Sequence, residues 1–169
     1  MIELKEFNKQ YEQEMLLLIQ SFWQEHNNCE VSLMNAKLDL ELYTSKNHFL
    51  YFIKKENQNV GFLHLASRGG EIDWLEDLYV KKDFQNQGIG TKAIQAVEQI
   101  VKAYSQSLYI EAASRNLKAI QLYHRLGYDC LNTITVRKDF QLSDFETIEK
   151  VTIGNQEFKI KKRKQKTSL

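Results

Sequence analysis

The alternation of apolar and polar positions divides the first half of the chain into strands and helices. Residues 2–7 (IELKEF) alternate with a period of two, which predicts a strand. Apolar residues then recur at helical spacing, and Ser32 is suited to cap a second helix. Two apolar segments around the polar turn NQN predict a β-hairpin. The predicted elements cover residues 2–7, 9–26, 33–45, 48–56 and 59–67.

The second half of the chain alternates strand-like and helix-like patterns. Gly127 ends the second of its two predicted helices, and Gly154 begins a turn within the last hairpin pattern. A strand, a helix and a strand in succession predict a parallel pair, whereas the hairpins predict antiparallel neighbours. We therefore expect an α/β protein with a mixed sheet. The predicted elements cover residues 72–80, 90–106, 107–113, 116–128, 130–140 and 147–163.

Length and composition favour one domain of ordinary globular type, because 169 residues can bury a core without a disulfide or a metal. We expect a single domain over residues 1–160 and a solvated basic tail over residues 161–169, with an RNA contact as the alternative for the tail. No apolar run reaches the ~20 residues of a membrane span. Without a secretion signal at the start, we expect a cytoplasmic protein with Cys29 and Cys130 reduced. The net charge of +1 makes a nucleic-acid partner an unfavoured interpretation.

Two glycines stand where the helix after residue 80 begins. A glycine inside a helix costs roughly 0.5–1 kcal/mol relative to alanine, so Gly88 and Gly90 call for an explanation. A nucleoside triphosphate loop is excluded because Thr91 and Lys92 come in the wrong order. The dinucleotide fingerprint fits GIGTKA literally, but a seven-residue gap after Val80 disfavours it. A helix start that cradles a pyrophosphate with backbone N–H groups explains the pattern best.

Two segments carry a resemblance to a known family. Residues 85–90 (QNQGIG) resemble the Q/R-x-x-G-x-G/A signature of the GNAT superfamily, the acetyl-CoA-dependent N-acetyltransferases. Residues 111–128 (EAASRNLKAIQLYHRLGY) resemble its second signature, and the order of elements agrees as well. One departure is Lys82, where many members carry a proline. The resemblance implies a central, mostly antiparallel mixed sheet of about six to seven strands with a splayed parallel pair, flanked by about four helices.

The resemblance implies that acetyl-CoA binds as cosubstrate, with its pantetheine arm paired to the strand at residues 74–80. Asn116 suits the N-cap of the following helix, and by resemblance its amide also contacts the cofactor. The expected cofactor-binding residues are Leu78, Tyr79, Val80, Gln85, Asn86, Gln87, Gly88, Ile89, Gly90, Thr91 and Asn116.

Tyr123 is the candidate general acid. By resemblance its hydroxyl, with a pKa near ~10, would protonate or hydrogen-bond a leaving thiolate whose pKa lies near ~8.5. The alternative interpretation is a core tyrosine, because Tyr123 falls on the inward stripe of its helix.

Glu76 is the candidate general base, with Asp77 and a water as the alternatives. Strict alternation places Glu76 on one face with Leu78, and Asp77 on the opposite face with Leu75 and Tyr79. By resemblance, acids on the face of Glu76 often act as base. An acid that binds a cationic substrate or forms a structural ion pair is the other interpretation.

The histidines show no metal spacing, and no metal is expected. His26, His48 and His64 are scattered, and His124 is expected at the surface. Neither cysteine falls within the signatures, so direct attack in a ternary complex is expected in place of a covalent intermediate.

Two functions remain open at this point. The first is an N-acetyltransferase acting on a primary amine of a small molecule or protein, and the second is a non-catalytic acyl-CoA sensor. Glu25 and Glu30 could favour a cationic acceptor, and Trp23 could stack on it. By resemblance a homodimer is a further expectation.

Overall fold

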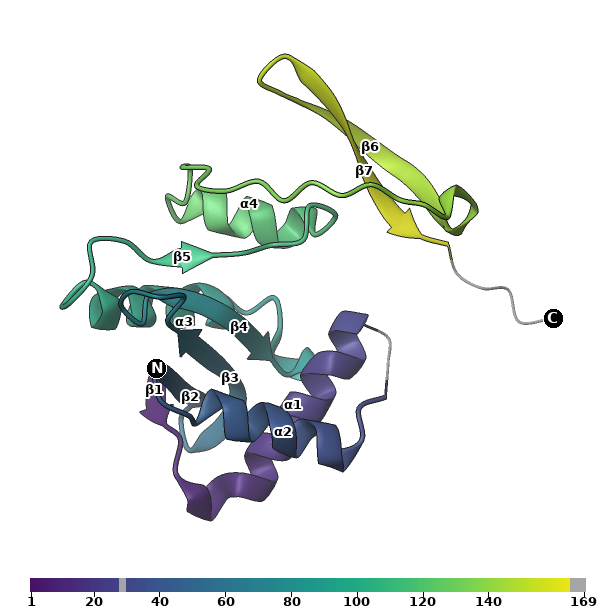
Figure 1. The fold of residues 1–169 in the computed structure, drawn as a ribbon. Coiled ribbons are helices and arrows are strands. Elements are labelled where there is room, and N and C mark those ends of the chain that lie inside the picture. Colours follow the sequence, from purple (N-terminus) through teal and green to yellow (C-terminus); the bar gives the residue numbers. More distant parts are fainter. Residues whose placement is uncertain (28–29, 165–169) are drawn as a thin grey trace. The chain divides into compact units, whose positions relative to one another are not determined.

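The first of two compact units, residues 1–111, is built on a five-stranded sheet (Figure 1). The computed structural model describes residues 1–27 and 30–164. Neighbouring strands are antiparallel except for the last pair, β4 and β5, which is parallel. In spatial order the strands are β1 (Ile2–Glu6), β2 (His48–Lys55), β3 (Gln58–Ala66), β4 (Trp74–Val80) and β5 (Tyr109–Ile110).

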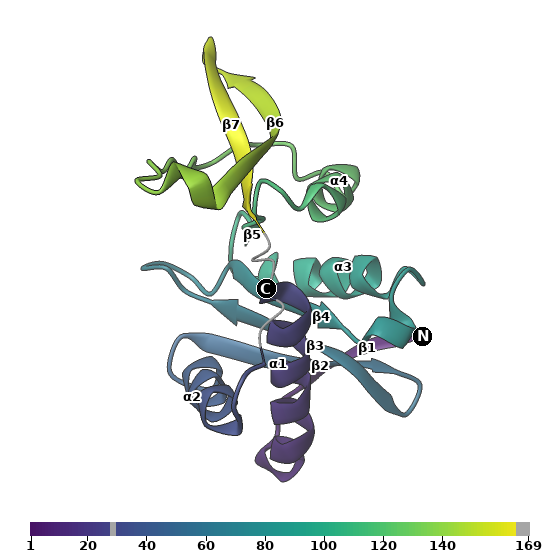
Figure 2. The ribbon, with the colours of Figure 1, turned by 90° about the vertical axis from the view of Figure 1, so that its right-hand side faces the viewer.

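Helices cover both faces of this sheet (Figures 1 and 2). On one face lie α1 (Glu12–Asn27), which follows the 3-10 turn η1 (Lys9–Tyr11), and α2 (Leu33–Tyr43). The opposite face is covered by α3 (Ile89–Val101), which follows the 3-10 turn η2 (Lys82–Phe84). Ser32 caps α2 as predicted, because its hydroxyl accepts a hydrogen bond from the N–H of Asn35 at 3.2 Å.

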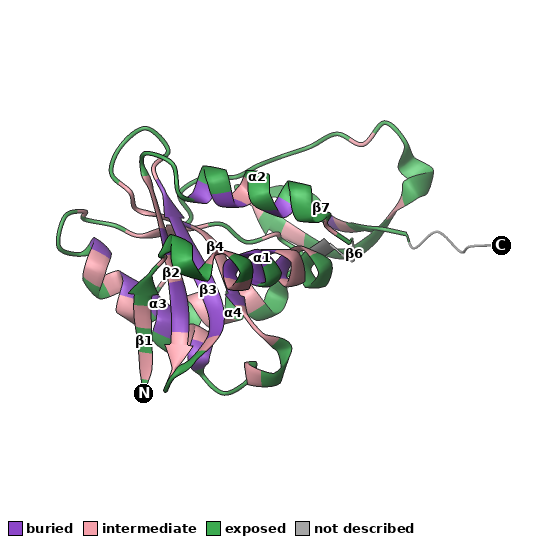
Figure 3. Cartoon of the chain, turned by 90° about the horizontal axis from the view of Figure 1, so that it is seen from below, coloured by how far each residue is buried: buried purple, intermediate pink, exposed green. Residues whose placement is uncertain are grey.

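Buried residues concentrate on the sheet and on the inward sides of its helices (Figure 3). Under α3, buried residues recur at helical spacing, and each large aliphatic side chain so buried contributes roughly 1.5–3 kcal/mol. These residues are Ile89, Ala93, Ile94, Val97 and Val101. The core under α1 and α2 consists of Met15, Leu16, Leu18, Ile19, Phe22, Ala36, Leu40, Tyr43, Leu50, Phe52, Phe62 and Tyr79.

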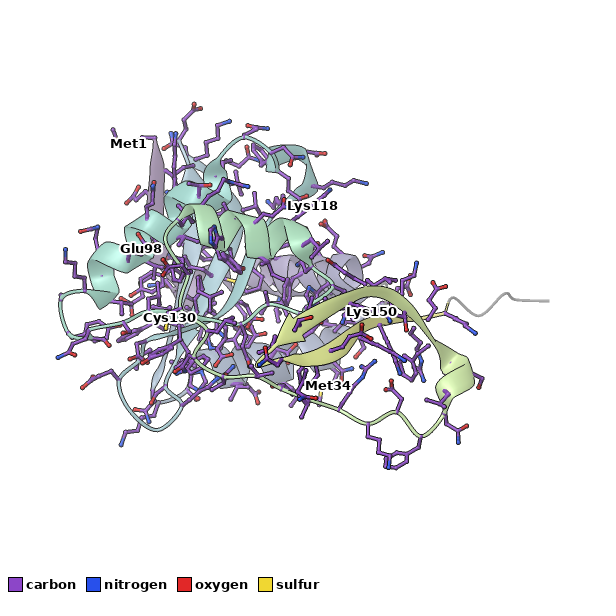
Figure 4. All side chains as sticks on the ribbon, turned by 90° about the horizontal axis from the view of Figure 1, so that it is seen from above. Met1, Met34, Glu98, Lys118, Cys130 and Lys150 are labelled. Atoms are coloured by element: carbon purple, nitrogen blue, oxygen red, sulfur yellow. The ribbon has the colours of Figure 1, made fainter. Side chains whose placement is uncertain are left out.

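The second unit begins at residue 112 and contains α4 (Leu117–Arg125), the 3-10 turn η3 (Leu142–Asp144) and a hairpin. The hairpin pairs β6 (Phe145–Ile153) with β7 (Gln156–Arg163), and Figure 4 shows side chains projecting from it, among them Lys150. Gly154 and Asn155 both have positive φ, of 56° and 63°, which is the geometry of a two-residue hairpin turn.

Most predicted elements are confirmed, including the hairpin of β2 and β3, the parallel pair and the turn at Gly154. The predicted strand at residues 130–140 is wrong, because residues 128–139 form no strand or helix. Alternation of apolar and polar residues predicts which face a strand would bury, but it does not supply a neighbouring strand to pair with. Leu131 and Val136, which the pattern would bury, are 77% and 66% exposed. The seven strands of the described residues also divide into two sheets. Cys29 and residues 165–169 of the basic tail lie outside the described residues.

Candidate active site

A β-bulge at Glu76 shapes the centre of the site. On β3 His64 pairs with Asp77 and Leu65 pairs with Leu75, so Glu76 has no counterpart. Directly opposed residues share a face, which places Asp77 with His64 and Leu75 with Leu65 on the other side of the sheet. The strict alternation expected from sequence, with Leu75 and Asp77 on one face, is therefore wrong because the extra residue shifts the pattern.

The parallel pair is short and leaves one edge of β4 open. Only Trp74 with Tyr109 and Leu75 with Ile110 are paired, and the two aromatic rings stack at 4.8 Å. Since β5 ends at Ile110 while β4 continues to Val80, no strand of the first unit, as far as it is described, pairs with the rest of β4 on that edge. Its N–H and C=O groups there can pair with the amides of a peptide-like ligand.

The loop after β4 is anchored to both β4 and α1 through Gln85. The amide nitrogen of Gln85 donates to the carbonyl oxygen of Val80 at 2.9 Å and to Glu25 at 3.0 Å. The other oxygen of Glu25 accepts from the hydroxyl of Tyr79 at 2.8 Å, and burial followed by this bond raises the pKa of Tyr79. Because Tyr79 is buried, its contact with a cofactor would be made by its backbone.

A second set of contacts holds the middle of the loop. Gln87 donates from its amide to the carbonyl oxygen of Asp83 at 3.0 Å and accepts from the ammonium of Lys55 at 3.0 Å. Asn86 takes the left-handed conformation, with φ of 58°. Lys55 was not expected from sequence, because it belongs to β2 and only the sheet brings its cation to the signature loop.

Gly88 and Gly90, at the start of α3, are glycines for two different reasons. Gly88 is the N-cap with φ of 73°, a conformation that favours glycine. Its carbonyl oxygen accepts a hydrogen bond from the backbone N–H of Lys92 at 3.1 Å. The N–H groups of Ile89, Gly90 and Thr91 form the first turn, where no carbonyl of the helix can reach them. A Cβ on Gly90 would meet no atom within 4 Å, so the fold itself does not require a glycine there. The bare backbone at Gly90 leaves room for an anion to approach these N–H groups.

Glu76 lies in an ion-pair cluster. Both of its carboxylate oxygens accept from Arg68, each at 2.7 Å, and Arg68 also donates to Glu111 at 2.6 Å. The guanidinium stacks 3.9 Å above the ring of Trp74. Hydrogen bonds to Glu76 and Glu111 raise the pKa of Arg68, and Arg68 lowers the pKa of Glu111. A substrate N–H would have to share an oxygen of Glu76 with this arginine.

Asp77 instead belongs to a hydrogen-bonded row that consists of Asp77, His64 and His48. Its carboxylate accepts from His64 at 2.9 Å, and His64 in turn contacts Nδ1 of His48 at 2.8 Å. The ring of Tyr43 stacks on His64 at 4.0 Å. Sequence reasoning missed this row, although the predicted hairpin contained the signal: His64 pairs with Leu50, two positions from His48 on the same face.

The two remaining predicted site residues belong to α4 in the second unit. The side chain of Asn116 accepts from the N–H of Ala119 at 3.3 Å, which confirms the predicted N-cap. Tyr123 is half-buried, contacts the ring of Tyr128 edge-on, and has its pKa raised by burial. Its hydroxyl is therefore protonated at neutral pH and able to donate.

Within residues 1–27 and 30–164, no group of three or more His, Cys, Asp or Glu side chains is arranged to hold a metal ion. Over the same ranges no helix has both the length and the apolarity needed to cross a bilayer.

The model of the Acetyltransferase (GNAT) family matches residues 9–128, which is most of the chain. The chain belongs to this family. Among curated GNAT relatives, a probable spermine N(1)-acetyltransferase of Bacillus subtilis subsp. natto (strain BEST195) is 30% identical over 64 residues, covering 37% of this chain and 41% of the relative. A thialysine N-epsilon-acetyltransferase of Sus scrofa is 41% identical over 68 residues, 39% of each protein. The chain thus spans about two fifths of the length of these relatives.

Solved structures agree with the GNAT assignment at the level of the fold. An aminoglycoside N-acetyltransferase, AAC(6')-Iy, in complex with CoA aligns with a TM-score of 0.66 at 14% identity, covering 83% of this chain and 95% of that one. GNAT proteins use acetyl-CoA, and two features of the first unit could hold parts of that molecule. The open edge of β4 suits its amide-bearing arm, and the space above Gly90, which a Cβ would fill, suits its pyrophosphate.

Proposed function

We propose that this GNAT protein transfers the acetyl group of acetyl-CoA to a primary amine by direct attack in a ternary complex. The observation that carries the proposal is the continuity of the open edge of β4 with the glycine-lined start of α3. β4 thus offers a pairing edge for the pantetheine arm, and the start of α3 offers free N–H groups for the pyrophosphate.

The residues proposed to hold the cofactor act mainly through backbone. Leu78 and Val80 would pair with the arm, and a backbone N–H of β4 would face the developing oxyanion. The loop from Gln85 to Thr91 would hold the pyrophosphate, with the ammonium of Lys55 adding positive charge beside Gln87. Bound acetyl-CoA supplies a thioester, an acyl group already activated for attack by an amine.

Two protons must be handled during the proposed transfer. An amine that arrives as an ammonium loses one proton before it attacks and a second as the amide forms, while the thiolate gains one. Tyr123 is proposed as the acid that serves the thiolate, since its phenol is protonated at neutral pH. For the proton that leaves the amine, the candidates from the sequence are Glu76, Asp77 and a water, and Glu76 also suits binding of the cation.

We propose a cationic primary amine as the acceptor class. The relatives named above are described as acting on spermine and thialysine, both of which carry amines, and the structural neighbour as acting on aminoglycosides. Within the first unit, Glu76, Asp77 and Glu111 gather carboxylates around the bulge of β4. The carboxylate of Glu25, which the sequence offered as a group that could attract a cationic acceptor, already accepts hydrogen bonds from Tyr79 and Gln85.

The test is thiol release from acetyl-CoA with spermine, thialysine and neamine as acceptors, together with calorimetry of acetyl-CoA binding. We expect saturable turnover with at least one amine, and a loss of kcat of ~10²-fold or more in Tyr123→Phe with little change in acetyl-CoA affinity. Binding of acetyl-CoA without turnover of any amine would favour the sensor function. Absence of binding would overturn the proposal.

A further inference from the structure

His64 is the central residue of the row that sequence reasoning missed. It is 3% exposed, and both of its ring nitrogens are engaged, Nδ1 with Asp77 at 2.9 Å and Nε2 with His48 at 2.8 Å. A buried imidazole with two polar partners lies in a fixed orientation, because losing either partner would leave a buried polar atom without a hydrogen bond. Tyr43 stacks on its ring at 4.0 Å.

The chemistry of the partners fixes which atoms carry protons. A carboxylate only accepts, so Nδ1 of His64 carries the hydrogen that bonds Asp77. In neutral His64 the Nε2 atom is then the acceptor, and Nδ1 of His48 must donate to it. This leaves Nε2 of His48 with its lone pair. Among the hydrogen bonds within the described residues, none engages that atom.

The charges around the row favour a neutral His48 that can accept a proton. Burial, followed by the neighbouring His64, lowers the pKa of His48, while the charge of Glu76 acts in the opposite direction. On the side of α2, Tyr43 faces the row, and burial with the charges of Asp77 and Asp39 keeps its phenol protonated by raising its pKa. The carboxylate of Asp77 behind His64 would stabilise an imidazolium formed there.

We propose that His48 is the general base of the acetyl transfer, with His64 and Asp77 as positioning residues behind it. The proposal rests on the function proposed above. Nε2 of His48 takes a proton from the substrate ammonium, and the proton on its Nδ1 passes to Nε2 of His64. The positive charge then resides on His64 next to Asp77. The neutral amine forms the C–N bond as the C–S bond breaks. Tyr123 protonates the leaving thiolate, and the second proton of the amine, released as the amide forms, restores the phenol through solvent. The row returns the first proton to solvent.

The bulge explains why this row and not Glu76 carries the proton. Glu76 and Asp77 are adjacent, but both oxygens of Glu76 are held by Arg68, which stays charged. Asp77 instead accepts from Nδ1 of His64, whose other ring nitrogen contacts His48. Glu76 is close enough for its charge to act on His48, so an ammonium bound at Glu76 would lie near the base.

The first experiment determines the tautomers of His48 and His64 in the absence of any amine substrate. Correlation of imidazole nitrogens and protons by NMR, followed across pH, should show Nδ1–H tautomers for both His48 and His64. In Asp77→Asn the amide can donate to Nδ1 of His64, which should switch both rings to the Nε2–H form and remove the acceptor atom of His48. Unchanged tautomers in Asp77→Asn would overturn the proposed relay.

The second experiment uses His48→Asn, whose amide can still donate to His64 but offers no imidazole base. With the best acceptor of the amine panel, kcat should fall by ~10²–10⁴-fold at neutral pH. The loss should shrink as pH approaches the ~10.4 of an alkylamine, where the amine is neutral without help. The matched control is His124→Asn, the same change at an exposed imidazole of α4.

The outcomes separate the two proposals. A loss in His48→Asn that is equal at every pH would overturn the base role and indicate a structural one. Acetyl-CoA affinity should stay within twofold of wild type, and a large loss of it would likewise overturn the role. If the wild type turns over no amine, the proposed function fails, whereas the tautomers still report whether the relay exists.

Discussion

β4 has two regions that would serve the same reaction by different means. Along its open edge and into the start of α3, backbone groups face the proposed cofactor, and the side chains matter mainly by being absent, as at Gly90. On the face covered by α1 and α2, side chains from three strands meet at the bulge, among them His48, His64 and Asp77. The first region is specified by local sequence. The second depends on the pairing of strands that are distant in sequence.

The largest expected effect lies in the side-chain region and comes from comparing two neighbouring carboxylates. Asp77→Asn should lower kcat by ~10²–10⁴-fold, because the wrong tautomer of His64 removes the base. Glu76→Gln should raise KM for spermine about tenfold with a smaller change in kcat, since one charge contact is worth roughly 1.4 kcal/mol there.

Steady-state kinetics of both variants over a range of pH checks this pair. A larger kcat loss in Glu76→Gln than in Asp77→Asn, together with a changed dependence on pH, would assign proton transfer to Glu76. The distinction between the two carboxylates would then be wrong.

The next largest effect lies in the backbone region. Gly90→Ala should raise the Kd for acetyl-CoA about tenfold, because its methyl group occupies the space proposed for the pyrophosphate. The same change should increase the free energy of unfolding by ~0.5–1 kcal/mol, since alanine favours the helix. Calorimetry and chemical denaturation measure the two quantities.

Gly70→Ala is the control for Gly90→Ala, because a Cβ there also meets no atom within 4 Å but lies outside the proposed site. Its acetyl-CoA affinity should equal that of wild type. A stabilised Gly90→Ala protein with unchanged affinity would contradict the placement of the pyrophosphate.

Sequence reasoning succeeded where local patterns determine the structure. The hairpins, the cap at Ser32, the N-cap at Asn116 and the glycine-lined helix start all follow from residues close together in the chain. The family signature likewise lies within one loop and helix. Roles proposed for Tyr123 and Glu76 stay predictions, since they concern chemistry and not local conformation.

The misassigned features all depend on pairing between distant segments. A bulge adds one residue to β4, and no periodicity reports it, so the face of Leu75 relative to Asp77 was predicted wrongly. Lys55 reaches Gln87 only because the sheet brings β2 to the loop. Residues 130–140 have a strand-like pattern, yet strand formation needs a partner, which no local pattern specifies.

A smaller effect is expected where the two regions are joined, at Glu25. Glu25→Gln cannot accept from both Tyr79 and Gln85, so the free energy of unfolding should fall by ~1 kcal/mol. The loosened loop should raise the Kd for acetyl-CoA by about two- to threefold, which corresponds to less than 1 kcal/mol. Glu41→Gln, at an exposed position of α2, is the control. Reduced stability with unchanged affinity would show that Glu25 supports only the core.

The smallest effect is a dependence of stability on pH that only the side-chain region should show. Burial and His64 lower the pKa of His48 below its usual 6.5, so protonation favours the unfolded chain. The contribution of neutral His48 is therefore complete above pH 6.5 and is lost as the pH falls through the lowered folded-state pKa. Tm should decrease over this acidic range in wild type and decrease less in His48→Asn. Arg68 stays charged over this range, because hydrogen bonds to Glu76 and Glu111 raise its pKa. Equal slopes in the two proteins would show that the row exchanges no proton with solvent.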